Sequence, residues 1–222
     1  MKYLCENIQG CVLGYTQSDE ITLILLDYQT FTTEAFFNYE VQKMCSIIAS
    51  MATMAFNRFF TQNVDNFRFA IGYDENGNLQ TKKYKQYSIY NQAVSKGAMF
   101  DCRVFNIPKE EVANLIYWRQ VDASRNSVQM VGQANFSQNE LQNKSCNMIQ
   151  DMLMTQKSIN WNDFPTHLKR GSCCIKIEEQ DPNVDIKDGY YPRTKWIVDK
   201  EIPIFKNEGR EYIEKLIMIG EE

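Results

Sequence analysis

The chain contains little of what several enzyme classes require. Its 222 residues include one histidine, His167, so serine–histidine–aspartate or cysteine–histidine chemistry would have to rest on that residue. Histidine-rich zinc sites are excluded. No run approaches the roughly 18 apolar residues that cross a bilayer, and the first residues lack the apolar stretch of a signal peptide. We therefore expect a cytoplasmic protein without membrane association.

Disulfide frameworks and strong basicity are also missing. The seven cysteines are odd in number and include no Cys-x-x-Cys pair, which favours reduced, partly buried thiols. The net charge is −4 and the sequence pI is about 5.2. Because nucleic acid repels an acidic surface, any RNA partner has to be held by a local basic patch.

The first part of the chain predicts a hairpin followed by a helix. Two short strands, Cys11–Tyr15 and Ile21–Leu26, flank a polar turn at residues 16–20. The second strand is apolar enough for a central, doubly covered position in a sheet. Apolar residues then recur at spacings of three and four from about 32 to 61, which predicts a long amphipathic helix.

The middle of the chain is more polar. Residues 63–97 predict an excursion from the core, with a turn at Asp74–Asn78 and lysines at 82, 83 and 85 just after it. Met99–Ile107 is predicted to be a strand. Pro108–Glu111 opens a helix, with proline in the first turn and carboxylates near the positive end of the helix.

The last part of the chain adds helices and strands. The capping box Ser137–Glu140 starts a helix that runs to about 156, and Ser172–Glu178 is a strand. Beyond Asp181 the tail is less regular, with a strand at 195–199 and a short terminal helix at 208–218. Strands that alternate with long helices indicate an α/β or α+β sheet domain with an α-helical annex.

Two adjacent carboxylates lie at the mouth of the predicted hairpin. Asp19 and Glu20 abut a strand that should be buried, and anions in such a place need a positive partner. Mg²⁺ suits this role because it takes carboxylate oxygens together with substrate phosphates. A surface turn, in which such acidic pairs are common, is the alternative.

Four segments in order resemble a known family: Gly14–Glu20, Phe100–Arg103, Tyr117–Ser127 and Lys169–Gly171. Together they look like the tRNA-histidine guanylyltransferase family, including its bacterial and phage relatives that act as 3′-to-5′ polymerases. The resemblance covers nearly the whole chain up to about Glu178. Each segment alone is unspecific, and their order makes the match specific.

The resemblance implies an α+β fold with a polymerase-like palm domain at residues 1–107, which residues 108–222 complete as one domain. It implies two magnesium ions, with Asp19 and Glu20 as metal ligands and catalytic residues. The family reaction joins the 3′-hydroxyl of an incoming nucleotide to an activated tRNA 5′ end. The implied substrates are GTP, ATP and tRNA, and the implied assembly is a homotetramer.

Further residues match phosphate-binding positions of the family. Lys43 lies on the predicted long helix, where its ammonium group could reach a polyphosphate, although a solvated lysine is the alternative. Arg103, if buried in its strand, needs a partner such as a phosphate or Asp101. Ser18 and Asn126 match positions near the triphosphate, and either could instead make local hydrogen bonds.

Within the same motif, Tyr117 and Trp118 favour core packing over base stacking.

The sequence also departs from the family pattern. The family's first metal aspartate precedes the hairpin in an Arg-Leu-Asp-Gly-Arg-like strand, and no aspartate precedes Ser18 here. A palm without its first strand is implied, so we expect the chain alone to be inactive or feeble unless a second polypeptide supplies the missing part. Ser124–Ser127 replaces a His-Ile-Asn-Asn run, which is similar to relatives that repair shortened tRNA 5′ ends.

Two competing functions remain open at this point. A non-catalytic tRNA-binding or assembly subunit would keep the fold without the first metal-binding strand. A palm-type nucleotide cyclase would share the metal ions without needing RNA, and the run from Trp118 to Ser127 argues against it.

Overall fold

The computed structural model describes residues 1–72, 80–179 and 193–219. The chain packs as two compact units. Unit 1 comprises Met1–Phe36 and Asn106–Glu222, and unit 2 comprises Phe37–Phe105. The single domain expected from residues 1–107 and 108–222 stays a prediction. Among the described helices, none has both the length and the apolar character that crossing a bilayer requires.

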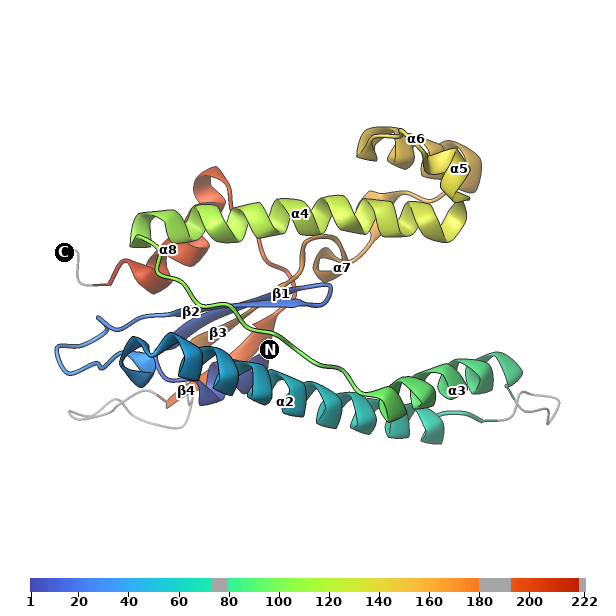
Figure 1. The fold of residues 1–222 in the computed structure, drawn as a ribbon. Coiled ribbons are helices and arrows are strands. Elements are labelled where there is room, and N and C mark those ends of the chain that lie inside the picture. The colour runs from blue at the N-terminus through green and yellow to red at the C-terminus, as the bar shows by residue number, and fades with distance from the viewer. Residues whose placement is uncertain (73–79, 180–192, 220–222) are drawn as a thin grey trace. The chain divides into compact units, whose positions relative to one another are not determined.

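Unit 1 is built on a four-stranded sheet in which every neighbouring pair is antiparallel (Figure 1). The strands are β1 (Cys11–Gln17), β2 (Glu20–Leu25), β3 (Ser172–Glu179) and β4 (Arg193–Asp199). Their order across the sheet is β2-β1-β3-β4. An antiparallel sheet combined with long helices confirms the α+β class, and all four predicted strands of this unit are present.

The central position predicted for the second strand is wrong. β2 lies at the edge of the sheet, and Ile24 is its one buried residue. β1 lies between β2 and β3, and Leu13, Gly14 and Tyr15 on it are buried in succession. Apolar content alone cannot separate these positions, because the partner of β1 is a strand from the far end of the chain.

Two helices cover one face of the sheet. They are α4 (Lys109–Asn135) and α8 (Glu211–Ile217), which follows the 3-10 turn η3 (Asn207–Arg210). The helix predicted to open at Pro108 is present and begins at Lys109, with Pro108 as its N-cap instead of a first-turn residue. Tyr15 and other sheet residues form the core with Ile116 of α4 and Ile213 of α8. This packing fixes α4 against the strand that leads to the predicted active-site turn.

The other face carries the short helix α1 (Lys2–Asn7), through Leu4, Cys5 and the following Ile8. Gly14 of β1 pairs with Cys174 of β3, and the Cys5 sulfur lies where a side chain at Gly14 would be. A hydrogen bond with Cys11 and burial raise the pKa of Cys5 to about 12. The thiol is therefore protonated at neutral pH, and all seven cysteines are free.

The far half of α4 forms a smaller core with the helical annex. It packs through Val128 against α6 (Cys146–Lys157). The short helix α5 (Gln138–Leu141) connects the two in the sequence. The predicted capping box at Ser137 and Glu140 is present, but the single helix to about 156 is wrong. The first helix ends at Leu141, because Gln142 has a non-helical ψ of 129° and Asn143 a positive φ of 61°, and Ser145 caps the next helix.

The chain then returns to the sheet through the 3-10 turn η2 (Trp161–Asp163) and α7 (Thr166–Arg170).

Unit 2 consists mainly of two helices, α2 (Val41–Phe69) and α3 (Thr81–Lys96). The short 3-10 segment η1 (Phe36–Tyr39) precedes α2. The long helix was expected to start near residue 32, and it starts later because Phe37, Asn38 and Tyr39 have positive φ angles that no right-handed helix can contain. Its end at Phe69 also lies beyond the predicted residue 61.

The strand predicted at Met99–Ile107 is wrong. In the described part of the chain no strand pairs with this extended segment. The backbone N–H groups of Ala98 and Phe100 instead donate to Asn57 Oδ1 (2.8 Å) and Thr53 Oγ1 (3.0 Å) of α2. Side chains of a helix thus satisfy backbone groups that a sheet would otherwise satisfy. The predicted turn at Asp74–Asn78 and the start of the tail at Asp181 lie outside the described residues.

Candidate active site

The predicted active-site turn is the two-residue loop between β1 and β2. Gln17 pairs with Glu20 across the hairpin, which leaves Ser18 and Asp19 at its tip. Ser18 has a φ of 50°, and both tip residues are exposed. The hydroxyl of Thr16 donates to the carbonyl oxygen of Glu20 at 2.9 Å and closes the turn. Asp19 is therefore presented to solvent at the end of the hairpin.

Glu20 already has a positive partner within the chain. Its carboxylate accepts a hydrogen bond from Gln17 Nε2 at 2.8 Å and forms an ion pair with the Arg119 guanidinium of α4. The Arg119 side chain is 18% exposed and the Glu20 side chain is 51% exposed. The expectation that a buried strand places both carboxylates in an apolar environment is corrected: one is half exposed and paired, and the other is exposed.

The contacts continue along α4. Arg119 Nη2 lies 3.9 Å from Asp122 Oδ2, and Asn126 Nδ2 donates to the same Asp122 oxygen at 3.1 Å. Residues three and four positions apart share one face of a helix, so Arg119, Asp122 and Asn126 form a polar row. Together with Gln17 and Glu20 they make up what we call the hairpin–α4 network. This network links Glu20 with Asn126 through intervening side chains, and Ser18 lies in the adjoining turn.

A hollow of about 280 Å³ lies between α4 and α7, and no residue of the hairpin–α4 network lines it. Tyr117 and Ser124 of α4, Trp161, Lys169 and Arg170 are among the residues that line it. Lys169 Nζ lies 5.5 Å from the centre of the Trp161 ring and donates to the carbonyl oxygen of Asn162 at 2.6 Å. The hollow therefore combines aromatic surface with positive charge, as a site for a nucleotide or an RNA end requires.

A tyrosine of the central strand ties this hollow to the hairpin. The Tyr15 hydroxyl donates to the carbonyl oxygen of Arg170 at 2.7 Å, and the Trp161 indole N–H donates to Ser127 Oγ at 3.1 Å. Burial raises the pKa of Tyr15, so its hydroxyl stays protonated and keeps donating. The segment Lys169–Gly171 is thereby fixed next to β1 even though more than a hundred residues separate the two in sequence.

The prediction for the aromatic pair on α4 holds for one residue. Tyr117 packs against the core of unit 1, whereas Trp118 is 63% exposed and so is not a core residue. The Arg119 guanidinium carbon lies 5.0 Å from the centre of the Trp118 ring. Tyr117 and Trp118 are consecutive residues of the helix and therefore point in different directions, so Trp118 faces away from the core that Tyr117 contacts.

Lys43 and Arg103, the other two predicted phosphate-binding residues, belong to unit 2. Lys43 is exposed on α2, with its Nζ 4.7 Å from the centre of the Phe37 ring. The expected strand environment of Arg103 is wrong, because its side chain is 88% exposed and pairs with Asp101 at 3.4 Å. The structure thus brings Glu20 and Asn126 into one network of unit 1, whereas Lys43 and Arg103 belong to unit 2.

The turn offers oxygen donors, the ligand type that Mg²⁺ prefers. Asp19 and Glu20 supply carboxylate oxygens, and proteins often bind Mg²⁺ through one or two carboxylates plus substrate phosphates. Within residues 1–72, 80–179 and 193–219, no group of three histidine, cysteine, aspartate or glutamate side chains could form a complete cage. A metal ion at this turn would therefore depend on ligands from the substrate or from elsewhere, and Glu20 would have to share its charge with Arg119.

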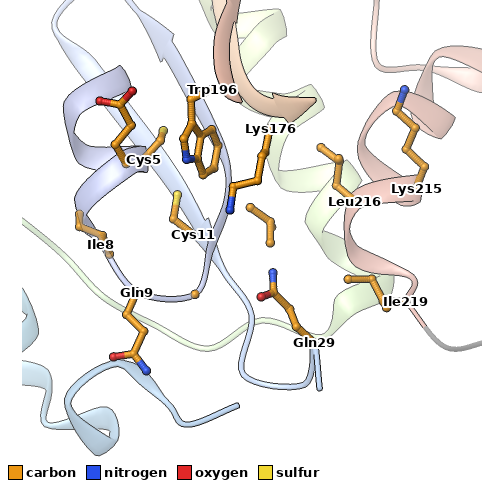
Figure 2. Close-up of a pocket in the computed structure, with 13 residues that line it drawn as sticks. Cys5, Ile8, Gln9, Cys11, Gln29, Lys176, Trp196, Lys215, Leu216 and Ile219 are labelled. Atoms are coloured by element: carbon orange, nitrogen blue, oxygen red, sulfur yellow. The ribbon is translucent and has the colours of Figure 1, made fainter. Parts of the chain in front are cut away.

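A second cavity, of about 420 Å³, lies among residues of α1, of the strands β1, β3 and β4, and of α8 (Figure 2). It is lined by Cys5, Cys11, Lys176, Trp196 and Lys215, among others. Lys176 Nζ lies 5.6 Å from the centre of the Trp196 ring. No residue predicted for the active site lines this cavity, so it is separate from the hairpin turn.

Comparisons with known proteins match this geometry to one family. A sequence model described as tRNAHis guanylyltransferase (Thg1) matches residues 1–108. A bacterial tRNAHis guanylyltransferase (Thg1)-like protein solved in complex with ATP is 37% identical, with a TM-score of 0.70, and the match covers 97% of this chain and 75% of that one. The chain belongs to the tRNAHis guanylyltransferase (Thg1) family.

Two further relatives support the family assignment. A bacterial Thg1-like protein solved in complex with GTP is 33% identical, with a TM-score of 0.66, over 98% of this chain and 74% of that chain. The uncharacterized protein R259 of Acanthamoeba polyphaga mimivirus is 28% identical over 173 residues, which are 73% of this chain. The chain spans about half, 54%, of the length of that curated relative.

The sequence did not single out Arg119, Asp122 or Trp161 as functional, although Arg119 and Asp122 fall in the motif Tyr117–Ser127. The spacing of Arg119, Asp122 and Asn126 on one helix was the available signal. It could not reveal the partner, because Glu20 and Arg119 are 99 positions apart.

Proposed function

We propose that the chain acts as a tRNA 5′-end nucleotidyltransferase of the Thg1 type, with GTP and ATP as substrates and Mg²⁺ as cofactor. The observation that carries the proposal is the match over 97% of the chain to a Thg1-like protein solved with ATP. The reaction proposed is 3′-to-5′ addition to tRNA. Assembly as a homotetramer and a cytoplasmic location rest on the family resemblance and are part of the proposal.

The hairpin turn supplies the metal ligands in this proposal. Asp19 and Glu20 would hold magnesium together with nucleotide phosphates, and the ion would supply Lewis acidity for the attacking hydroxyl and positive charge for the leaving polyphosphate. Ser18 presents its hydroxyl beside these carboxylates. The pairing of Gln17 with Glu20 and the hydrogen bond between their side chains hold the Glu20 carboxylate next to the end of the strand.

The α4 residues orient the Glu20 carboxylate. Arg119 pairs with the Glu20 carboxylate, and Asp122 and Asn126 hold Arg119 and the rest of the row in place. A phosphate that enters this region competes with Glu20 for the guanidinium, which binds phosphate oxygens well. Asn126, Lys43 and Arg103 are proposed to contact the triphosphate.

Substrate choice is part of the proposal. Ser124–Ser127 stands where histidine-specific members have a different run, and Ser124 lines the hollow next to Trp161 and Lys169. We favour repair of shortened tRNA 5′ ends over addition to tRNAHis alone. Comparing extension of a 5′-truncated tRNA with extension of tRNAHis distinguishes these substrates.

The test is incorporation of labelled GTP at a tRNA 5′ end in the presence of Mg²⁺. Asp19→Ala is expected to lower the rate by at least about 100-fold, because it removes a group that stabilises charge in the transition state. Asp151→Ala, which removes an exposed carboxylate from α6, is the matched control and should keep the wild-type rate. Incorporation that survives Asp19→Ala would rule out the metal role.

A non-catalytic tRNA-binding subunit is the second candidate. It is favoured by the ion pair that already occupies Glu20 and by the lack of a three-ligand metal cage among the described residues. The test measures RNA binding and GTP incorporation, with and without an added polypeptide that carries the family's first metal-binding strand. RNA binding without incorporation of GTP under both conditions would support this alternative.

A further inference from the structure

Positive charge is concentrated in unit 2. Eight of the chain's 24 lysines and arginines lie between Phe37 and Phe105, but only five of its 28 aspartates and glutamates do. Unit 2 therefore carries a net charge of +3, while the rest of the chain carries −7. A polyanion is attracted to unit 2 and repelled by the remainder of the protein.

Within unit 2, helix α3 has the largest excess of positive charge. Its 16 residues include four lysines and no acidic residue. Lys82, Lys85 and Lys96 are three and eleven positions apart, which places them on one face of the helix. From the rise of an α-helix this face is about 21 Å long between its outer lysines. We call Lys82, Lys85 and Lys96 the α3 lysine face.

Packing against α2 leaves this face open. Tyr90 packs edge-on against Phe60 and Phe67 of α2, with ring centres 6.3 Å and 5.9 Å apart. Every residue of the α3 lysine face is exposed. The described part of the chain has no ion pair between these lysines and a carboxylate. Aromatic contacts thus hold the helix while its ammonium groups stay in solvent.

The positions of Lys82 and Lys85 work against the helix itself, whereas Lys96 lies in the last turn, where the helix dipole favours a cation. Lys82, like its neighbour Lys83, lies in the first turn of α3, where the helix dipole is positive and carboxylates are favoured. Lys82 and Lys85 are also like charges three positions apart, which repel each other. This placement of Lys82 and Lys85 opposes local stability, and no described carboxylate pairs with either of them, which points to a role in binding.

We propose that the α3 lysine face binds the phosphate backbone of a structured RNA, the body of the tRNA whose 5′ end the chain extends. Lysine ammonium groups contact phosphates without reading bases, so this contact is independent of sequence. The identity of the RNA rests on the proposed function. The contact itself rests on the charges of unit 2 alone.

A second copy of the chain is the competing occupant, because the same helix exposes Ile89 and Tyr84. Charge argues against it. Two such faces would bring six lysines together without an acidic group on α3 to offset them, and like charges across an interface are unfavourable.

The test compares the binding of a fluorescently labelled tRNA transcript to three proteins by anisotropy at several salt concentrations. The variant K82Q/K85Q/K96Q removes the lysine face while keeping good helix formers. The control K144Q/K200Q/K206Q removes the same charge from three exposed positions of unit 1. All three are full-length chains, and circular dichroism establishes that both variants are folded.

We expect K82Q/K85Q/K96Q to raise the Kd for tRNA about tenfold or more at physiological salt. The slope of log K against log salt should become shallower by about 2 to 3, since each phosphate contact contributes just under one. The control should bind with less than a twofold change in Kd. An unlabelled DNA hairpin added as competitor reports whether the contact requires the RNA form of the backbone.

Several results would overturn the proposal. They are an unchanged Kd and salt slope in K82Q/K85Q/K96Q, an equal loss in both variants, or no tRNA binding by the wild-type chain. A change in sedimentation with unchanged RNA binding would assign the face to a second copy instead. Incorporation of GTP is measured in parallel: if the wild type incorporates none but the variant still loses RNA affinity, the catalytic proposal fails while the RNA contact stands.

Discussion

Arg119 supplies the positive charge that Glu20 needs, and it does so from the helix that packs on the sheet. Its guanidinium reaches Glu20 and Asp122, while its own side chain is largely covered. Because the Glu20 carboxylate is half exposed, solvent screens the pair and limits its contribution to stability. The main effect of the pair is therefore to fix the direction of the carboxylate next to the hairpin turn.

A double-mutant cycle measures this pairing. Arg119→Met and Glu20→Gln are each expected to lower the free energy of unfolding, with a coupling energy of about 0.5 to 1 kcal/mol, which is the range for a partly exposed ion pair. Urea unfolding followed by tryptophan fluorescence is the measurement. All three tryptophans lie in unit 1, so the signal reports the unit that contains the pair.

The matched cycle uses Arg125→Met with Glu20→Gln. Arg125 is an exposed residue of the same helix, and its coupling to Glu20 should be zero within error. A coupling for Arg119 no larger than that for Arg125 would show that the pair contributes nothing to the fold in solution.

At the scale of elements, the hairpin is the part that the sequence predicts best. Two apolar runs around a polar turn were enough to place Ser18, Asp19 and Glu20 at its end. The start of α2 was missed because three residues with positive φ, Phe37 among them, interrupt a periodic pattern that continues on both sides. The Glu20–Arg119 pair was missed because it depends on how α4 lies against the sheet, which local sequence does not encode.

Close packing of α1 on the sheet depends on the absence of a side chain at Gly14. A Cβ at this position would collide with the Cys5 sulfur, which hydrogen-bonds with Cys11 and is enclosed by the sheet. Gly14→Ala is therefore expected to lower the free energy of unfolding by about 1 to 3 kcal/mol, as overpacking in a core does. The same urea titration measures it.

Gly72→Ala is the control for Gly14→Ala. A Cβ at Gly72 meets no atom within 4 Å, so this change should be neutral or slightly stabilising through its effect on the unfolded chain. If Gly14→Ala left the unfolding midpoint at the wild-type value, α1 would have to yield freely, and its packing on the sheet would be looser than the structure shows.

At the scale of the whole molecule, the two units differ in how much they bury. α4 of unit 1 has seven buried residues, including Ile116 and Gln120, whereas α3 of unit 2 has none. The Gln120 side chain also donates to the carbonyl oxygen of Pro203 at 2.8 Å and accepts from the Phe205 N–H at 2.9 Å. Stability should therefore be highest around α4 and lowest in α3.

Hydrogen exchange tests this difference directly. Amides of α3 are expected to show protection factors at least about 100-fold lower than those of α4, because α3 can open without exposing a buried side chain. Mass spectrometry of peptides from both helices and from β3 gives the measurement, with β3 as the internal reference for unit 1. Equal protection of α3 and α4 would mean that the lysine-bearing helix is held by contacts beyond those with α2. Slower exchange of α3 on addition of tRNA is expected if RNA binds the α3 lysine face, because a ligand that binds only the folded helix stabilises it against opening.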